Sequence, residues 1–166
     1  MLSVKKMFTG QRVAAVIAFS GAILFSLVLL SWPNLRNYRQ VAFVESTFNG
    51  NVSRMKLLMA VGADVNKFEC QTFRCRTPLI AAAQAGQYEA AQLLLAHGAD
   101  VNKRMKRGQT ALMFASYYGH TELVRLLLAN AADVNADFEG DTALSWAKQK
   151  GHAEIVNLLS ATGAKR

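Results

Sequence analysis

The feature that most constrains the fold is a set of phrases that recurs along the chain with a period close to 33 residues. One phrase occurs as TPLIAA at 77–82, TALMFA at 110–115 and TALSWA at 142–147. A second phrase, GADVN or AADVN, occupies 62–66, 98–102 and 131–135. A third phrase runs from a Gly to a Glu, at 86–89, 119–122 and 151–154. Several phrases in one register indicate tandem copies of one structural unit, each of which must stack on its neighbours.

Each copy contains the signals of two short helices joined by a turn. A Thr at the start of a helix can accept a hydrogen bond from an unpaired backbone N–H, and Pro78 fits the first turn that follows. A Gly ends that helix in left-handed geometry, and a Glu suits the positive end of the second helix. Leucines at 93–95, 126–128 and 158–159 supply the buried face of each second helix. The residues in the capping roles are Thr77, Thr110 and Thr142, Gly86, Gly119 and Gly151, and Glu89, Glu122 and Glu154.

A period near 33 residues with a T-P-L-x-x-A phrase resembles the ankyrin repeat, and the resemblance covers about residues 40–164. Two features depart from the family pattern. Ile80, Met113 and Ser145 replace the usual His after T-P-L, and the first copy (about 39–66) lacks the phrase altogether.

The resemblance implies an all-α ankyrin-repeat solenoid of helix-turn-helix units with finger hairpins between them. We expect four repeats, at about 40–69, 76–105, 109–138 and 141–166. The first is expected to be the amino-terminal cap, with a first helix over Gln40–Phe48 that exposes Glu45 and Ser46. The last repeat ends without the D-V-N phrase and is expected to be the carboxyl-terminal cap.

An apolar segment precedes the repeats. Residues 13–30 (VAAVIAFSGAILFSLVLL) carry no charge, and as a helix they would extend about 27 Å, just enough for a bilayer core. Trp32 stands where an indole meets lipid headgroups, and Pro33 is expected to end the helix. We therefore expect a basic tail at 1–12, a transmembrane signal anchor at 13–32, a linker at 33–39 and the repeat domain at 40–166.

Two other interpretations of the apolar segment stay open, a cleaved signal peptide and a buried core helix. The run is longer than a usual signal-peptide core and lacks Ala at the cleavage positions, while a core helix would show a polar face. Lys5, Lys6 and Arg12 precede the segment, and Arg36 and Arg39 follow it. The positive-inside tendency then places the amino terminus in the cytoplasm and the repeats across the membrane, by a margin of one or two charges.

The composition excludes several classes of protein. Hydrophobic residues make up 52% and charged residues 18% of 166, which excludes a largely disordered chain. Two Pro and two Cys exclude collagen-like and disulfide-dense scaffolds. The net charge of +8 favours anionic partners without identifying one.

The two cysteines, Cys70 and Cys75, lie in an enlarged loop of the first copy. A hairpin there could bring their sulfurs together, and in an oxidising compartment a disulfide would stiffen the loop. Two free thiols are the simpler alternative. A metal site is disfavoured because no nearby Cys or His supplies the remaining ligands.

The loops between repeats differ in charge, and we call them finger one (64–77), finger two (100–110) and finger three (133–142). In the ankyrin family the fingers and first helices form the concave partner surface. That surface is expected to be basic in fingers one and two and acidic in finger three, and Glu69 is the only acid identifiable near finger two. Solvated loop charges kept for solubility are the alternative. The candidate partner-binding residues are Arg74, Arg76, Lys103, Arg104, Lys106, Arg107, Asp137, Phe138 and Glu139.

No catalytic constellation is apparent in the sequence. His120 and His152 fall in the turn between paired helices, and no nucleophile with a partner, P-loop or H-E-x-x-H motif occurs. We expect no enzyme and no cofactor, but a membrane-tethered protein-binding module or, alternatively, a specific inhibitor of an enzyme at the membrane. The partner is an unknown protein, with anionic lipid contact as an addition; nucleic acid is excluded because no aromatics interleave the basic run. An anchor before a small ankyrin domain resembles bacterial inner-membrane proteins that face the periplasm.

Overall fold

The structure, a computed structural model, describes residues 33–71 and 74–164. The chain divides into two units, Met1–Tyr38 and Arg39–Arg166, and the packing below concerns the second unit. The elements are α3 (Pro33–Phe48), α4 (Val52–Ala60), β1 (Glu69–Gln71), β2 (Arg74–Arg76), α5 (Pro78–Ala85), α6 (Tyr88–Ala96), α7 (Ala111–Tyr118), α8 (Thr121–Ala129), α9 (Ala143–Lys150) and α10 (Ala153–Ala161).

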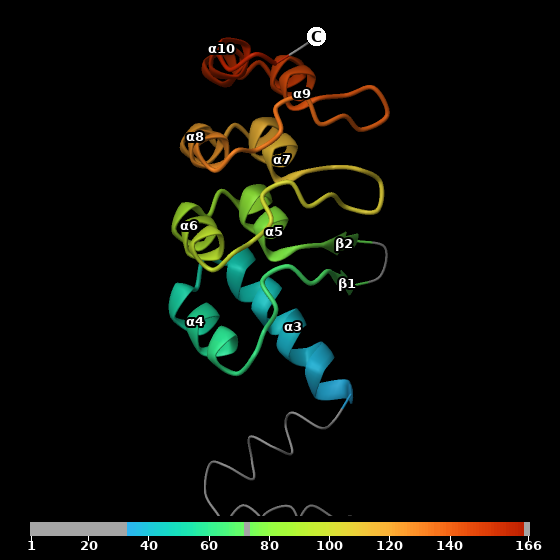
Figure 1. Cartoon of the computed structure of the whole chain (residues 1–166), viewed down its shortest axis with the longest axis vertical. Coiled ribbons are helices and arrows are strands. Elements are labelled where there is room, and N and C mark those ends of the chain that lie inside the picture. Colours follow the sequence, from blue (N-terminus) through green and yellow to red (C-terminus); the bar gives the residue numbers. More distant parts are fainter. Residues whose placement is uncertain (1–32, 72–73, 165–166) are drawn as a thin grey trace, which may run out of the picture. The chain divides into compact units, whose positions relative to one another are not determined.

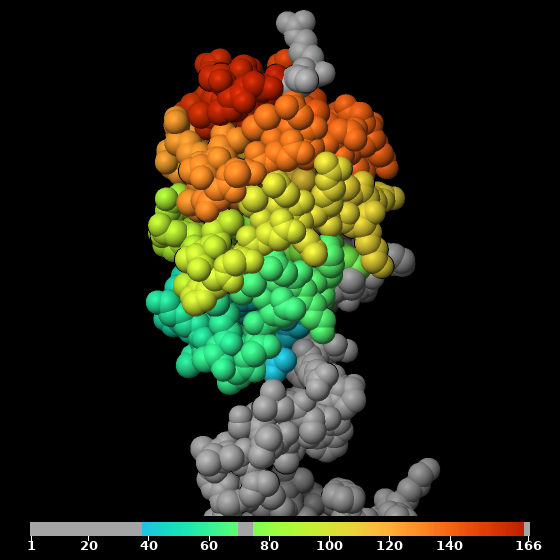
Figure 2. All heavy atoms as spheres, in the orientation of Figure 1, coloured from blue at the N-terminus to red at the C-terminus, as the bar shows by residue number. Residues whose placement is uncertain are grey.

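These helices form four consecutive pairs, as the repeated phrases predict. First helices pack on first helices, α5 on α7 and α7 on α9, while second helices form a parallel row beside them (Figure 1). The fingers project beyond the row of first helices (Figure 1). In the space-filling view the repeats follow one another as layers in chain order (Figure 2). The second unit is therefore an all-helical ankyrin-type stack with finger loops.

Local capping starts and ends the first helices where the sequence predicts. The hydroxyls of Thr77, Thr110 and Thr142 each accept a hydrogen bond from the backbone N–H three residues on. Pro78 occupies the first turn of α5. The closing glycines at 86, 119 and 151 have φ of 70°, 80° and 74°, in the left-handed region where a Cβ is costly.

The core combines leucines of the second helices with alanines of the first. Leu94, Leu127 and Leu159, one leucine of each stripe, are fully buried. Their leucine neighbours at 93, 95, 126, 128 and 158 are only partly buried, against the expectation of one continuous buried stripe. Fully burying one such side chain stabilises the fold by about 1.5–3 kcal/mol. Small residues such as Ala82 and Ala115, both fully buried, allow consecutive first helices to approach closely.

The first helix begins earlier than expected. Residues 33–39 were predicted to be a linker, with the helix starting at Gln40, but α3 starts at Pro33. Pro33 was also expected to end a preceding helix. A proline at the first helical position loses no hydrogen bond and has a suitable φ, so it begins a helix as readily as it ends one.

Ser46 corrects a second expectation, because it is buried whereas Glu45 is exposed as predicted. The Ser46 hydroxyl donates to the carbonyl oxygens of Ala42 and Phe43, at 2.8 and 2.9 Å. A serine whose hydroxyl bonds within its own helix can enter the core without an unpaired polar group.

Finger one contains the enlarged hairpin that the spacing of the cysteines predicts. β1 and β2 pair in antiparallel register, with Cys70 opposite Cys75 and Glu69 opposite Arg76. Among the residues that the structure describes, no helix is long and apolar enough to cross a bilayer. The predicted tail and anchor, residues 1–32, lie outside the described residues.

Candidate protein-binding surface

The side of the first helices that faces the fingers carries a group of aromatic side chains. Phe114 is the fourth residue of α7 and Trp146 the fourth residue of α9, each following a Thr cap by four positions. Met113 and Ala115 beside Phe114, and Ala147 beside Trp146, are buried, whereas the two aromatic rings are only partly buried. At the same position of α5 stands Ala81, which is fully buried. Repeats three and four therefore present rings where repeat two presents none.

Trp146 is the centre of this group, which we call the aromatic cluster (Phe114, Tyr117, Phe138 and Trp146). Its ring lies 5.7 Å from Phe114 and 5.6 Å from Tyr117 between centroids, both edge-to-face. Phe138 of finger three approaches it at 6.2 Å, so the cluster joins two first helices to a finger. Edge-to-face pairs add about 0.5–1.5 kcal/mol each beyond burial, which holds these rings in place before any partner arrives.

A cation at the end of α9 and a more exposed ring on α7 extend the cluster. The Lys150 ammonium lies 4.3 Å from the centroid of the Tyr117 ring, at cation–π distance. Tyr118, 50% exposed, contacts Tyr117 edge-to-face. Tyrosine and tryptophan held in this way are residue types enriched in protein interfaces, because they bury much area with little loss of side-chain entropy.

Finger two supplies the exposed positive charge beside the cluster. Arg104, Lys106 and Arg107 are exposed, as predicted, and Met105 between them is partly buried against the core. Lys103 turns toward finger one, with its ammonium 5.8 Å from the Phe68 ring centroid.

The acid that approaches finger two is one that sequence reasoning did not single out. The Arg104 guanidinium lies 3.9 Å from a carboxylate oxygen of Asp133, and both side chains are 49% exposed. An exposed pair at this distance contributes little to stability and leaves the arginine available to a partner.

Finger three holds its acidic groups in a tight turn. Phe138 and Asp141 pair across Glu139 and Gly140, whose φ values of 54° and 87° are both positive. Two positive φ values in a two-residue loop are typical of a type I′ hairpin turn. Asp137 accepts a hydrogen bond from the Gly140 N–H at 2.9 Å. Asp137 therefore supports the turn, while Glu139 is exposed at its tip.

Finger one contributes packing where a free charge was expected. Arg76 donates to the Gln84 side-chain oxygen at 3.1 Å and lies over the Phe48 ring at 4.9 Å, linking the hairpin to α5 and α3. Glu69 is 7% exposed. Burial raises the pKa of the Glu69 carboxyl above 4.5, the charge of Arg76 opposes that rise, and the charge of Glu45 adds to it.

The two cysteines lie opposite each other in this hairpin. Cys75 is disulfide-bonded. The side chains of Arg74 and Cys70 lie outside the part of the chain that the structure describes, so the role of Arg74 and the pairing in the native compartment stay predictions.

The histidines that the sequence analysis placed in turns act between repeats. The imidazole of His152 lies against Gly119 of the preceding repeat and shares a 3.0 Å hydrogen bond with the Tyr117 carbonyl oxygen. His120 lies against Gly86 in the same way. Both stand at helix N-cap positions without making a side-chain capping bond. Their role is packing between consecutive repeats.

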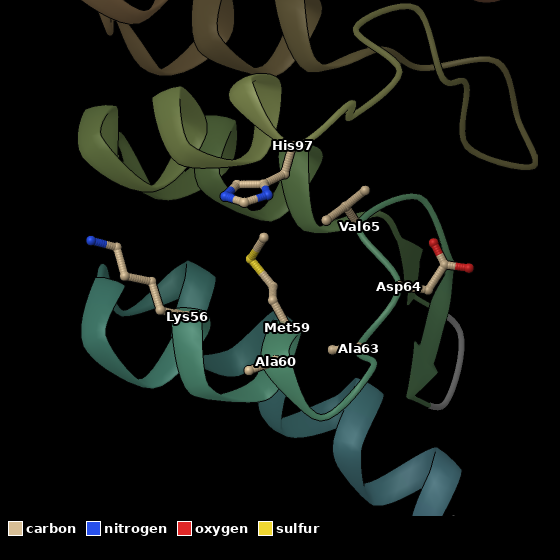
Figure 3. Close-up of a pocket in the computed structure, with 7 residues that line it drawn as sticks. All are labelled: Lys56, Met59, Ala60, Ala63, Asp64, Val65 and His97. Carbon is tan, nitrogen blue, oxygen red and sulfur yellow. The ribbon is translucent and has the colours of Figure 1, made fainter.

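An open hollow of about 690 Å³ lies elsewhere, between α4 and the end of α6 (Figure 3). Its lining is mostly apolar, and Lys56 and Asp64 stand at opposite ends of it (Figure 3). A small-molecule site needs a few polar groups that converge on the ligand, and they do not converge here. The described residues also contain no group of three or more His, Cys, Asp or Glu able to hold a metal ion. The aromatic cluster with fingers two and three is thus the candidate site.

Comparison with known families agrees with this architecture. A family model described as ankyrin repeats, with three copies, matches residues 15–105 and 100–165. The chain belongs to the ankyrin-repeat family. Repeats of this family typically serve as non-catalytic modules, and they identify this ankyrin-repeat protein as a protein–protein interaction module.

A relative of this ankyrin-repeat protein is the 2-5A-dependent ribonuclease of Mus musculus, which is 39% identical over 69 residues. The alignment covers 42% of this chain and 9% of the ribonuclease, so the chain spans only a small part of that relative. The similarity is one of repeat regions.

Three aromatic residues of the site were missed by sequence reasoning: Phe114, Tyr117 and Trp146. A signal for them existed, because aligning the Thr phrases places Ala81, Phe114 and Trp146 in one column. Only the contact of Trp146 with Phe138 shows that this column faces the fingers.

Proposed function

We propose that this chain is a membrane-tethered, non-catalytic module that binds a protein partner on the aromatic cluster, between the basic finger two and the acidic finger three. The observation that carries the proposal is Trp146, which contacts two first-helix rings and one finger ring yet is not fully buried. Interfaces typically have such rigid aromatic anchors at their centre and charged residues around them.

The opposite charges of the two fingers would orient the partner. Arg104, Lys106 and Arg107 attract an acidic segment, while Glu139 favours a basic one. Exposed charges act mainly by steering the encounter, so they set the association rate more than the lifetime of the complex.

Capture of partners from detergent-solubilised membranes by the full chain tests the site. Trp146→Ala is expected to weaken the captured complex by about 2 kcal/mol or more, as for a central aromatic anchor. Tyr88→Ala, on α6 and 37% exposed, removes an aromatic ring from the row of second helices and should leave capture unchanged. Equal losses of capture in both variants, or no loss in either, would show that the aromatic cluster is not the binding site.

Charge reversal tests the fingers separately. Arg104→Glu with Arg107→Glu should slow association and reduce its salt dependence, and Glu139→Lys with Asp137→Lys probes the acidic pole. An unchanged association rate and salt dependence in the finger-two variant would show that finger two is only a solvated loop.

The tether is proposed from residues 13–30, an uncharged apolar run long enough for a bilayer core. With Lys5, Lys6 and Arg12 on the cytoplasmic side, the repeats would face the periplasm of a bacterial inner membrane. A reporter active only outside the cytoplasm, fused after Arg166, should be active. An inactive reporter on a well-expressed fusion would reverse the orientation.

In that compartment we propose that Cys70 pairs with Cys75, supported by their register in finger one. Alkylation of the non-reduced protein should modify neither thiol.

A second candidate function is that of a stoichiometric inhibitor of a membrane enzyme, because the aromatic cluster and its fingers would cover the partner's active site. Loss of the captured partner's activity in the complex would distinguish an inhibitor from a scaffold. We also propose that the same basic fingers contact lipid phosphates.

A further inference from the structure

Helix α4 leaves open a face that every later second helix buries. The third and sixth residues of α6, α8 and α10 pack into the stack. The third residues are buried and the sixth are partly buried against the core: Ala90, Leu123 and Ile155, and Leu93, Leu126 and Leu158. In α4 the same two positions are Arg54, which is exposed, and Leu57, which is 70% exposed.

Val61 continues this face one turn beyond Leu57 and is 53% exposed. Terminal repeats of solenoids usually carry a polar outer face, because no neighbour covers it. Two large aliphatic side chains four positions apart on one helix are a departure from that rule. We call Arg54, Leu57 and Val61 the open face of α4.

The charges around the open face are positive. Arg54 and Lys56 are exposed, and α4 contains no acidic residue. The Arg39 guanidinium donates to the Val61 carbonyl oxygen at 2.8 Å, which adds a third cation at the end of the helix. Aliphatic side chains flanked by basic ones suit an anionic lipid surface, where the cations meet phosphates and the aliphatic groups enter the boundary below them.

The chain length also brings this face close to the proposed anchor. Nine residues lead from Leu30, the last residue of the apolar run, to Arg39. Even fully extended, that stretch spans no more than about 30 Å. Arg39 in turn is bonded to Val61. A bilayer that holds residues 13–30 would therefore always lie within reach of the open face, at a high effective concentration.

We propose that the open face of α4 docks on an anionic bilayer surface, with Leu57 and Val61 inserted at the headgroup boundary and Arg54 beside lipid phosphates. The inference rests on the proposed tether, because a single short face binds lipid weakly unless the anchor keeps it nearby. Docking would fix the repeat stack relative to the membrane and leave the aromatic cluster free for its partner.

The test uses the full chain reconstituted in phosphatidylcholine vesicles with and without phosphatidylglycerol. Hydrogen exchange of peptides covering 52–60 should slow by about threefold or more in the anionic vesicles, because docking opposes local opening of the helix. Leu57→Asn with Val61→Asn should abolish the slowing, as should Arg54→Gln, which changes only an exposed side chain. Tyr88→Asn, an exposed position on α6, is the control and should leave the slowing intact.

Retention of the protein on vesicles through an alkaline wash reports the tether separately. Retained protein with the same α4 exchange in both vesicles overturns the docking and leaves the tether standing. Protein that is not retained overturns the tether and the docking with it. If the exchange of α4 slows with rising protein density in neutral vesicles, a second copy of the chain covers this face. If the exchange is equally slow under all conditions, a segment of the chain itself covers it. Either result overturns docking on lipid.

Discussion

Ala131 adopts a left-handed backbone conformation at a position where the other repeats have glycine. Its φ is 61°, while Gly62, Gly98 and Gly163 at the same position have φ between 79° and 88°. A Cβ in the left-handed region costs about 1–2 kcal/mol, partly offset by the greater flexibility of glycine in the unfolded chain. We expect Ala131→Gly to raise the free energy of unfolding by about 0.5 kcal/mol in chemical denaturation. Ala129→Gly, the same change inside α8, should lower it.

Glu69 makes stability depend on pH in an unusual direction for a carboxyl group. Burial raises its pKa in the folded protein above the ordinary 4.5. As pH rises from 4.5 through the raised pKa, the unfolded chain releases this proton before the folded one does, so the free energy of unfolding falls. Glu69→Gln should remove that fall. Unfolding curves measured across this range should converge at low pH and separate above it, with the variant more stable; parallel curves would contradict the raised pKa.

At the scale of elements, the turn glycines have different neighbours. A Cβ built on Gly119 would lie 2.6 Å from the His152 ring, whereas one on Gly151 would meet nothing within 4 Å. Both positions have positive φ, 80° and 74°. Gly151→Ala should cost about 1 kcal/mol from backbone strain alone, and Gly119→Ala about 2–4 kcal/mol because the ring must also move.

His152→Ala in the background of Gly119→Ala isolates the contact between repeats. Removing the ring should recover the part of the loss that the clash causes, so the two substitutions should not be additive. Additive losses in chemical denaturation would show that the histidine does not press on the glycine.

Across the whole stack, asparagines of the D-V-N phrases join consecutive fingers. The Asn102 amide donates to the Ala131 carbonyl oxygen at 3.2 Å and accepts from the Asp133 N–H at 2.7 Å. Asn102→Ala should cost about 1–3 kcal/mol, since both backbone groups lose a partner. It should also lower the m-value, the slope of the unfolding free energy against denaturant concentration, because repeats two and three become less strongly coupled.

The control for that change is Asn130→Ala nearby. Among the described residues the Asn130 side chain bonds only its own helix, at the Leu126 carbonyl oxygen, so the cost should stay within about 0.5 kcal/mol. Equal costs for the two asparagines would mean that the fingers are not coupled through Asn102.

The repeat register, the Thr and Gly ends of the first helices and the hairpin in finger one could all be predicted from the sequence. These features depend on contacts over a few residues, such as Thr110 with the N–H of Met113, and so they can be recognised in short phrases. The sign of the charge on each finger also follows directly from its residue types. The pairing of helices followed from the period, because one unit cannot bury its leucines alone.

Which side chains the stack buries and which it leaves exposed became clear from the packing of the repeats. Ser46 and Glu69 are buried, and Arg76 packs on Phe48 instead of pointing to a partner. The Trp146 ring contacts aromatic rings of α7 and of finger three. Such contacts join residues that are distant in sequence or that lie on different elements, so they depend on how one repeat is set against the next. A local phrase carries no information on that placement, which is why the candidate site appeared only in three dimensions.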